Sequence, residues 1–197
     1  HAVDHEISYS HPITNVSLID FWINYLKYEK NFDINKVGYL DRDNLISYKA
    51  GIAFRISSKS FIREHILSLQ KNKNTNINND ILNNVKIIKY LMKFNNFATF
   101  SITGESISDN YYDRFYDFYF EDYFDIDLSE LRNKIVKMPD YKKIKLSFSN
   151  DPGKKISYYL ETSYSIDDFD DKATYNSINS KLKINEKIDI EFGYDIF

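Results

Sequence analysis

Four histidines are the first side chains of this sequence that could do chemistry. His1 and His5 open the chain, His11 follows, and His65 lies further along. An N-terminal histidine can bind copper through its amine and its ring, and a second imidazole, such as that of His65, could complete the site. The cysteine-free, glycine-poor surroundings do not resemble a copper oxidase. We therefore expect an ordinary terminus and no metal.

Carboxylates gather in two places. Asp167, Asp168, Asp170 and Asp171 stand together, and oxygen ligands at alternate residues can hold calcium. This segment lacks the hinge glycine and the bidentate glutamate of an EF-hand loop, so it predicts a solvated turn between two strands.

The second acidic group lies among aromatic residues. Glu121 and Asp125 would share one face of a strand, with Asp122 and Asp127 beside them, which superficially suggests a sugar-cleaving carboxylate pair. No characteristic spacing between these carboxylates supports that assignment. The sequence also shows no Ser-His-Asp arrangement, P-loop or dinucleotide fingerprint. We predict no enzyme activity, no catalytic residue and no cofactor.

Composition narrows the classes of protein. The 197 residues, of which 43% are hydrophobic, predict one domain over 1–197. A net charge of −3 provides no basic field for phosphates, so nucleic acid is not an expected partner. The absence of cysteine excludes disulfides, thiolate metal sites and a cysteine nucleophile.

The elements that would position any site are mostly strands. Apolar residues occupy alternate positions in 46–56, 156–166 and 188–196, and a period of two indicates a strand. Turn residues at 150–153, 167–171 and 185–187 separate such segments. The stretch 142–196 therefore predicts four consecutive strands of an antiparallel meander, and 90–102 alternates again.

Other segments are ambiguous. Residues 16–28 and 61–69 fit either a strand or an amphipathic helix. Residues about 71–84 are polar and of low complexity, which predicts a loop.

Alternation alone does not show whether the apolar face meets a protein core or lipid. The segments 46–56, 156–166 and 174–184 each run eleven positions. Strands of soluble domains cluster around 5–6 residues, whereas a tilted membrane strand needs roughly 9–11. Lys, Asp and Glu on the polar faces suit a wet lumen, whereas scarce glycine argues against a barrel. Lipid-facing candidates are Ile156, Tyr158, Leu160, Tyr164, Ile188, Ile190, Phe192 and Tyr194.

Residues 111–124 contain nine aromatics in fourteen positions. They fit a ring-rich core or edge strand, or a belt at a membrane interface, where tyrosine places its ring in lipid and its hydroxyl at the headgroups. Candidates for such a belt are Tyr111, Tyr112, Phe115, Tyr116, Tyr119 and Tyr123.

Two segments carry a family resemblance. Residues 31–44 (NFDINKVGYLDRDN) match the pattern D-x-N-x-x-G-F/Y-L-x-R-D/N-D/N through Asp33, Asn35, Gly38, Tyr39, Leu40, Arg42, Asp43 and Asn44. Residues 111–159 then show an aromatic-acidic run, Leu131-Arg132 with Pro139, and KIKLSFSNDPGKKISYY. In order and spacing, about 15–197 resembles a family of large bacterial outer-membrane proteins. In that family a carbohydrate-binding-like β-sandwich precedes a C-terminal membrane β-barrel of unassigned function.

The resemblance is incomplete. The family usually has Arg before the Lys of its turn, whereas Gly153 precedes Lys154 here. Its barrel continues beyond the equivalent of Phe197, which itself falls on the polar phase of the last strand. The resemblance implies an internal or truncated portion of such a barrel.

The expected fold is all-β, an antiparallel meander that forms an outer-membrane β-barrel or a segment of one. The expected function is a structural or transport component of the bacterial outer membrane, with the lipid bilayer and other envelope proteins as partners. The alternative is a soluble, secreted or periplasmic, β-rich or α+β binding module.

Overall fold

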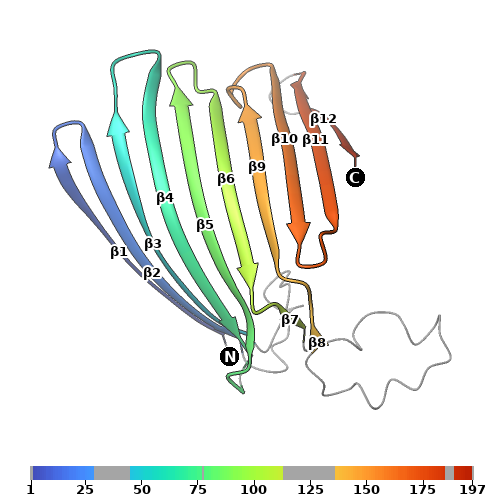
Figure 1. Ribbon diagram of the computed structural model, residues 1–197. Helices are drawn as coiled ribbons and strands as arrows, with labels where there is room; N and C mark the ends of the chain where they lie inside the picture. The colour runs from blue at the N-terminus through green and yellow to red at the C-terminus, as the bar shows by residue number, and fades with distance from the viewer. Residues whose placement is uncertain (1, 29–44, 77, 113–135, 185–188, 197) are drawn as a thin grey trace.

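The computed structural model describes residues 2–28, 45–76, 78–112, 136–184 and 189–196. These residues form an all-β fold dominated by one 10-stranded antiparallel sheet, in which successive strands lie side by side (Figure 1). The strands are β1 (Ala2–Thr14), β2 (Ser17–Tyr28), β3 (Leu45–Ser57), β4 (Ile62–Thr75), β5 (Ile81–Phe94), β6 (Thr99–Ser108), β9 (Tyr141–Ser149), β10 (Ile156–Asp167), β11 (Lys172–Lys183) and β12 (Asp189–Ile196). A 2-stranded ribbon, β7 (Tyr111–Tyr112) with β8 (Val136–Lys137), stands between β6 and β9 in the chain. The predicted meander is confirmed.

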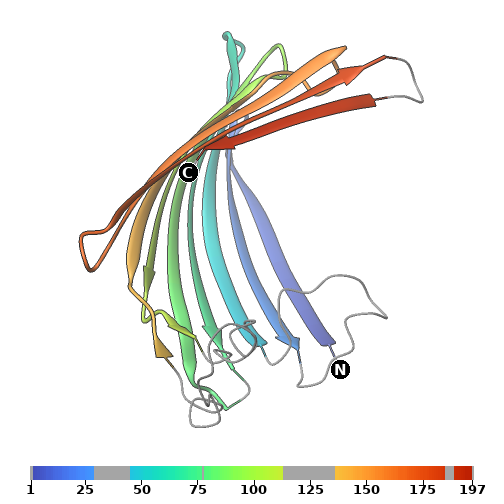
Figure 2. The ribbon, with the colours of Figure 1, turned by 90° about the vertical axis from the view of Figure 1, so that its right-hand side faces the viewer.

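The sheet is an open, curved single layer (Figure 2). Its edges are β1 and β12, which do not pair with each other among the described residues, so the sheet is not closed into a barrel. In the described parts of the chain, no helix is long and apolar enough to cross a membrane.

The strand register keeps the two faces of the sheet chemically distinct. Leu160 of β10 lies opposite Phe148 of β9 and Ile178 of β11, and Leu67 of β4 lies opposite Tyr90 of β5. Residues directly opposite in an antiparallel pair point to the same face. One face, the apolar face, therefore takes the odd positions of β1, β2 and β4 and the even positions of β3, β5, β6 and β9–β12. It carries Ile7, Phe21, Ile52, Leu67, Ile88, Ile102, Leu146, Leu160, Ile178 and Phe192. The opposite side is the polar face.

Two alanines of β3 allow the burial of the two faces to be compared directly. Ala50 on the apolar face is exposed, whereas Ala53 on the polar face is only 6% exposed. The same holds for small polar residues of the polar face, since Ser101 and Ser177 are 5% and 4% exposed. In a one-layer sheet, side chains on the inner side of the curve converge and those on the outer side spread apart. The polar face is thus the crowded one, and large apolar side chains lie exposed on the other.

The structure resolves the ambiguous segments as strands. Residues 16–28 contribute β2, and most of 61–69 belongs to β4, so neither forms a helix. The alternation over 90–102 is interrupted by a turn at 95–98, where Phe97 adopts a left-handed φ of 63°. The four strands predicted over 142–196 are β9–β12, and Asp151 Oδ1 accepts the N–H of Gly153 at 2.8 Å in the predicted turn.

The loop predicted over about 71–84 is wrong for most of that range. β4 continues to Thr75 and β5 begins at Ile81, which confines the connection to 76–80. Asparagine-rich sequence suggested a loop, but Asn74 Nδ2 donates to Asn83 Oδ1 across the hairpin at 2.8 Å. Cross-strand amide pairing therefore lets this polar segment continue the sheet.

Candidate functional site

The lipid-facing candidates that the structure describes gather on the apolar face. Their exposed fractions run from 38% for Leu160 and Ile190 to 66% for Tyr194. The candidates are Ile156, Tyr158, Leu160 and Tyr164 of β10 and Ile190, Phe192 and Tyr194 of β12. Ile188 lies outside the described residues. The described candidates thus share one face of the sheet, on two strands that are separated by β11.

Of the aromatic-belt candidates, the structure places only the first two. Tyr111 and Tyr112 form β7 and lie opposite Lys137 and Val136 of β8, below the main sheet in Figure 1. Phe115, Tyr116, Tyr119 and Tyr123 lie outside the described residues, as do the acidic residues 121–127, the 31–44 motif and Leu131-Arg132.

The histidines do not assemble into a metal centre in the described chain. His5 and His11 lie on β1 and His65 lies on β4, with two strands between them. His65 Nδ1 instead contacts the hydroxyl of Tyr90 at 2.6 Å. Among the described residues, no group of three His, Asp or Glu side chains could hold a metal ion. His1 is outside the described range.

The Asp167–Asp171 cluster forms the turn predicted for it. Asp167 Oδ1 accepts the N–H groups of Phe169 at 2.9 Å and of Asp171 at 3.0 Å. Asp170 takes a left-handed φ of 62°. The Asp167 carboxylate is therefore engaged by the backbone of its own turn, as in an Asx-turn.

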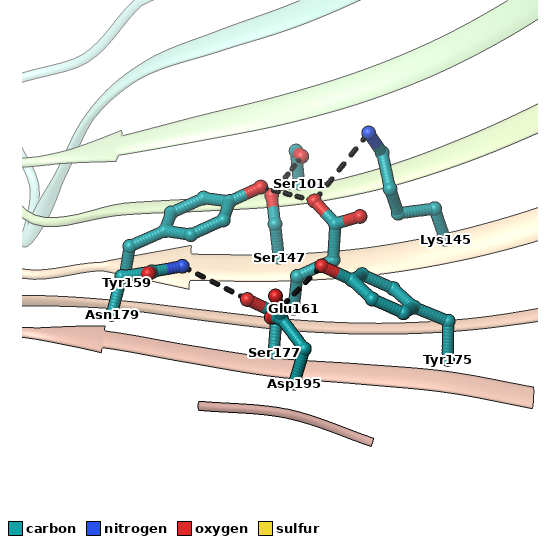
Figure 3. A network of polar contacts seen from close by, with 9 residues as sticks. All are labelled: Ser101, Lys145, Ser147, Tyr159, Glu161, Tyr175, Ser177, Asn179 and Asp195. Carbon is teal, nitrogen blue, oxygen red and sulfur yellow. Dashed lines mark hydrogen bonds and ion pairs between the residues drawn. The ribbon is translucent and has the colours of Figure 1, made fainter. Parts of the chain in front are cut away.

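The strongest candidate site is a polar cluster on the polar face, which sequence reasoning missed (Figure 3). It draws on β6, β9, β10, β11 and β12. Five of its residues form one register row: Ser101, Ser147, Glu161, Ser177 and Asp195. The others are Lys145, Tyr159, Tyr175 and Asn179.

Glu161 is the centre of this cluster. The Tyr159 hydroxyl donates to Glu161 Oε2, and Lys145 Nζ lies 3.5 Å from the same oxygen. The side chain of Glu161 is 13% exposed. A carboxylate this deeply placed needs a counter-charge and donors, and both are present.

Hydroxyl and amide pairs extend the cluster to both sides. Ser101 and Ser147 share a hydrogen bond between their Oγ atoms at 2.8 Å across β6 and β9. On the other side, Asn179 Nδ2 donates to Ser177 Oγ at 2.8 Å, and the Tyr175 hydroxyl donates to Asp195 Oδ1 at 3.0 Å. The result is a fixed network of hydroxyl, amide and charged groups across five strands.

A second charged contact lies on the same face near the other edge. Arg55 Nε is 2.6 Å from Asp20 Oδ2, and Ser10 Oγ donates to Asp20 Oδ1 at 2.5 Å. Hydrophilic contacts therefore lie on the polar face in two parts of the sheet, over β1–β3 and over β6 and β9–β12. The signal that could have found the central cluster is the turn at 150–153, because fixing that hairpin brings Lys145 diagonally beside Glu161.

Comparison with protein-family models, with curated proteins and with solved structures finds no match. The arrangement of the residues themselves therefore carries the functional argument.

Proposed function

We propose that this chain is an outer-membrane β-barrel protein, or part of one, that acts as a structural or transport component of the bacterial envelope. The observation that carries the proposal is the reversed burial of the two faces. Small hydroxyl residues are buried on the polar face, and large apolar residues are exposed on the apolar face. A membrane barrel has this distribution, because its outside meets lipid and its inside meets water.

Strand length supports the same proposal. The strands of the sheet run from 8 residues in β12 to 14 in β4 and β5. A tilted strand needs about 9–11 residues to cross the hydrocarbon layer, whereas soluble strands are typically half as long. Nearly every strand of the sheet is thus long enough to span.

The edges of the sheet set a requirement on the proposal. Unpaired backbone N–H and C=O groups are very costly in lipid, so a spanning sheet needs both edges paired. The proposal therefore requires β1 and β12 to pair in the membrane, with each other, with further strands of the same protein or with another envelope protein. The resemblance to the outer-membrane family supports this location.

Extraction of the cells that make this protein tests the proposal. Sodium carbonate should leave the protein in the membrane pellet, and detergent should then release it. A peripheral protein would leave the membrane in carbonate. Recovery in the soluble or carbonate fraction would reject the outer-membrane proposal.

Which face of the sheet meets lipid can be tested with the single tryptophan of the sequence. Trp22 lies opposite Gly51 on the polar face. In vesicles of brominated phosphatidylcholine, a quencher confined to lipid, Trp22 should be quenched weakly. In the Trp22→Phe/Leu160→Trp variant, a tryptophan on the apolar face should be quenched strongly. Equal quenching at both positions would contradict the proposed orientation.

The second candidate is a soluble, secreted or periplasmic binding module. The open sheet favours it, because a free edge strand such as β12 can accept a strand from a partner. In that case the exposed apolar face would cover a protein surface, and the protein would appear in the soluble fraction of the extraction experiment.

A further inference from the structure

Three lysines lie in one register row on the apolar face. Lys71 of β4 is opposite Lys86 of β5, Lys86 is opposite Ser106 of β6, and Ser106 is opposite Lys142 of β9. All three lysines are exposed. Like charges placed opposite each other destabilise a sheet, so this lysine row costs free energy unless an anion lies against it.

No carboxylate of the described residues neutralises the lysine row. On the polar face, three lysines do have acidic partners: Lys93 with Glu64 at 2.7 Å, Lys145 with Glu161 at 3.5 Å, and Lys181 with Asp189 at 2.6 Å. In the part of the chain that the structure describes, Lys71, Lys86 and Lys142 form no ion pair. The strand residues on the apolar face of β3–β6 and β9 include no Asp or Glu.

A groove adjoins the lysine row. It has a volume of about 720 Å³ and is lined by the three lysines and by apolar residues, among them Ile52, Leu69 and Ile88. Glu105 and Lys143, one acidic and one basic residue at polar-face positions of β6 and β9, also border it. Gly104 also lines it, and a Cβ there would lie 3.1 Å from Ile88 Cγ2. The missing side chain of Gly104 therefore helps to keep the groove open. Cationic groups beside an apolar groove match a molecule with an anionic head and a hydrocarbon chain.

The row also lies at a boundary of the apolar face. Leu69 and Ile88 stand two residues from Lys71 and Lys86 towards the middle of their strands. The row is at the lower end of the sheet in Figure 1, where the chain leaves for the long connections 29–44 and 109–140. In outer-membrane barrels the longer connections face the cell exterior, so this end corresponds to the outer leaflet.

We propose that the lysine row and its groove bind one phosphate-bearing lipid of the outer leaflet. The phosphate lies against the lysines, and an acyl chain lies in the groove beside Gly104. Lysines at the edge of an apolar surface reach the headgroup level while their stems stay in the hydrocarbon. This inference rests on the proposed function and assigns it a specific lipid-binding site.

Lipid titration tests the site. The chain, folded in a non-ionic detergent, is titrated with phosphorylated lipid A, and bound lipid is counted by native mass spectrometry. Each basic residue near an anionic lipid contributes a factor of about five in binding, so Lys71→Gln/Lys86→Gln should weaken binding about 30-fold. The control, Lys49→Gln/Lys89→Gln, makes the same change of charge on the polar face and should bind like the unmodified chain.

Two further measurements distinguish binding of the lipid phosphate from binding of the acyl chain. Gly104→Leu fills the groove and should weaken lipid A binding, whereas excess inorganic phosphate should not displace the lipid. Equal losses in both double-lysine variants, or equal binding of dephosphorylated lipid A, would overturn the inference. If carbonate leaves the protein in the membrane and lipid A still does not bind, only the lipid site fails. Soluble protein would instead reject the proposed function itself.

Discussion

Trp22 of β2 lies directly opposite Gly51 of β3, and its indole fills the space that a side chain at residue 51 would occupy. A Cβ on Gly51 would lie 2.1 Å from Trp22 Cζ2, which is far inside van der Waals contact. The glycine is therefore required by its neighbour rather than by a turn. An aromatic ring that covers a strand glycine also pins the register of the pair.

Gly51→Ala should therefore displace the indole. We expect a shift in Trp22 fluorescence emission and a loss of about 1–3 kcal/mol in the free energy of unfolding, the usual cost of overpacking. Gly104→Ala is the control, since its Cβ would meet only Ile88 Cγ2, at 3.1 Å, on the opposite face. Unchanged emission in Gly51→Ala would contradict the packing described.

The strands were predictable where a turn and a clean period of two occur together. The hairpin of β9 and β10 follows from the turn at 150–153 and from the alternation that includes Leu146 and Leu160. In β2, residues of both faces are apolar, for example Leu18 and Ile19, so local pattern did not separate strand from helix. Pairing with β1 and β3 decides the matter there, and single-segment periodicity contains no information about pairing.

The candidate sites depended on register, which the sequence specifies only indirectly. Glu161 and Lys145 are sixteen residues apart in the chain, and Lys71 and Lys142 are still further apart. Only the pairing of several strands places them in one cluster or one row. The Asp167–Asp171 turn, in contrast, was predictable because its contacts are local.

A test at the Asp167–Asp171 turn distinguishes a structural role of its carboxylates from metal binding. Asp167→Ala removes the acceptor of two backbone N–H groups and should cost about 1–2 kcal/mol of unfolding free energy. Asp171→Ala is the matched control, because no hydrogen bond of the Asp171 side chain is found among the described residues. Chemical denaturation should give the same order of unfolding free energies, with Asp167→Ala below Asp171→Ala, whether calcium or EDTA is present. Calcium-dependent stability that both substitutions abolish would favour a metal site instead.

The Lys145–Glu161 contact predicts a measurable coupling on the polar face. Glu161→Gln leaves Lys145 without its counter-charge, and Lys145→Met leaves Glu161 with only its tyrosine donor. The Lys145 side chain is 37% exposed, so solvent screens the pair and the coupling should be modest, about 0.5–1 kcal/mol. A double-mutant cycle of unfolding free energies measures it. Strict additivity of the two substitutions would show that the contact contributes nothing.

The apolar face yields the prediction that bears most directly on function. Leu160 is 38% exposed in the middle of β10, so Leu160→Arg at a water-exposed surface should change stability by no more than about 0.5 kcal/mol. On a lipid-facing strand near the bilayer midplane the same change should cost about 2–4 kcal/mol. We expect the larger loss when urea unfolding is measured in vesicles.

Thr174→Arg supplies the control for depth on the same face. Thr174 is exposed near the beginning of β11 and lies opposite Tyr164. The cost of arginine falls to about 0–1 kcal/mol near a membrane interface, so this variant should remain close to the unmodified chain. A small cost at both positions would mean that water or a polar partner meets this face. A large cost at Leu160 alone requires a hydrocarbon environment at mid-strand. On a merely crowded surface, the cost of arginine would not depend on how far the residue lies from the membrane interface.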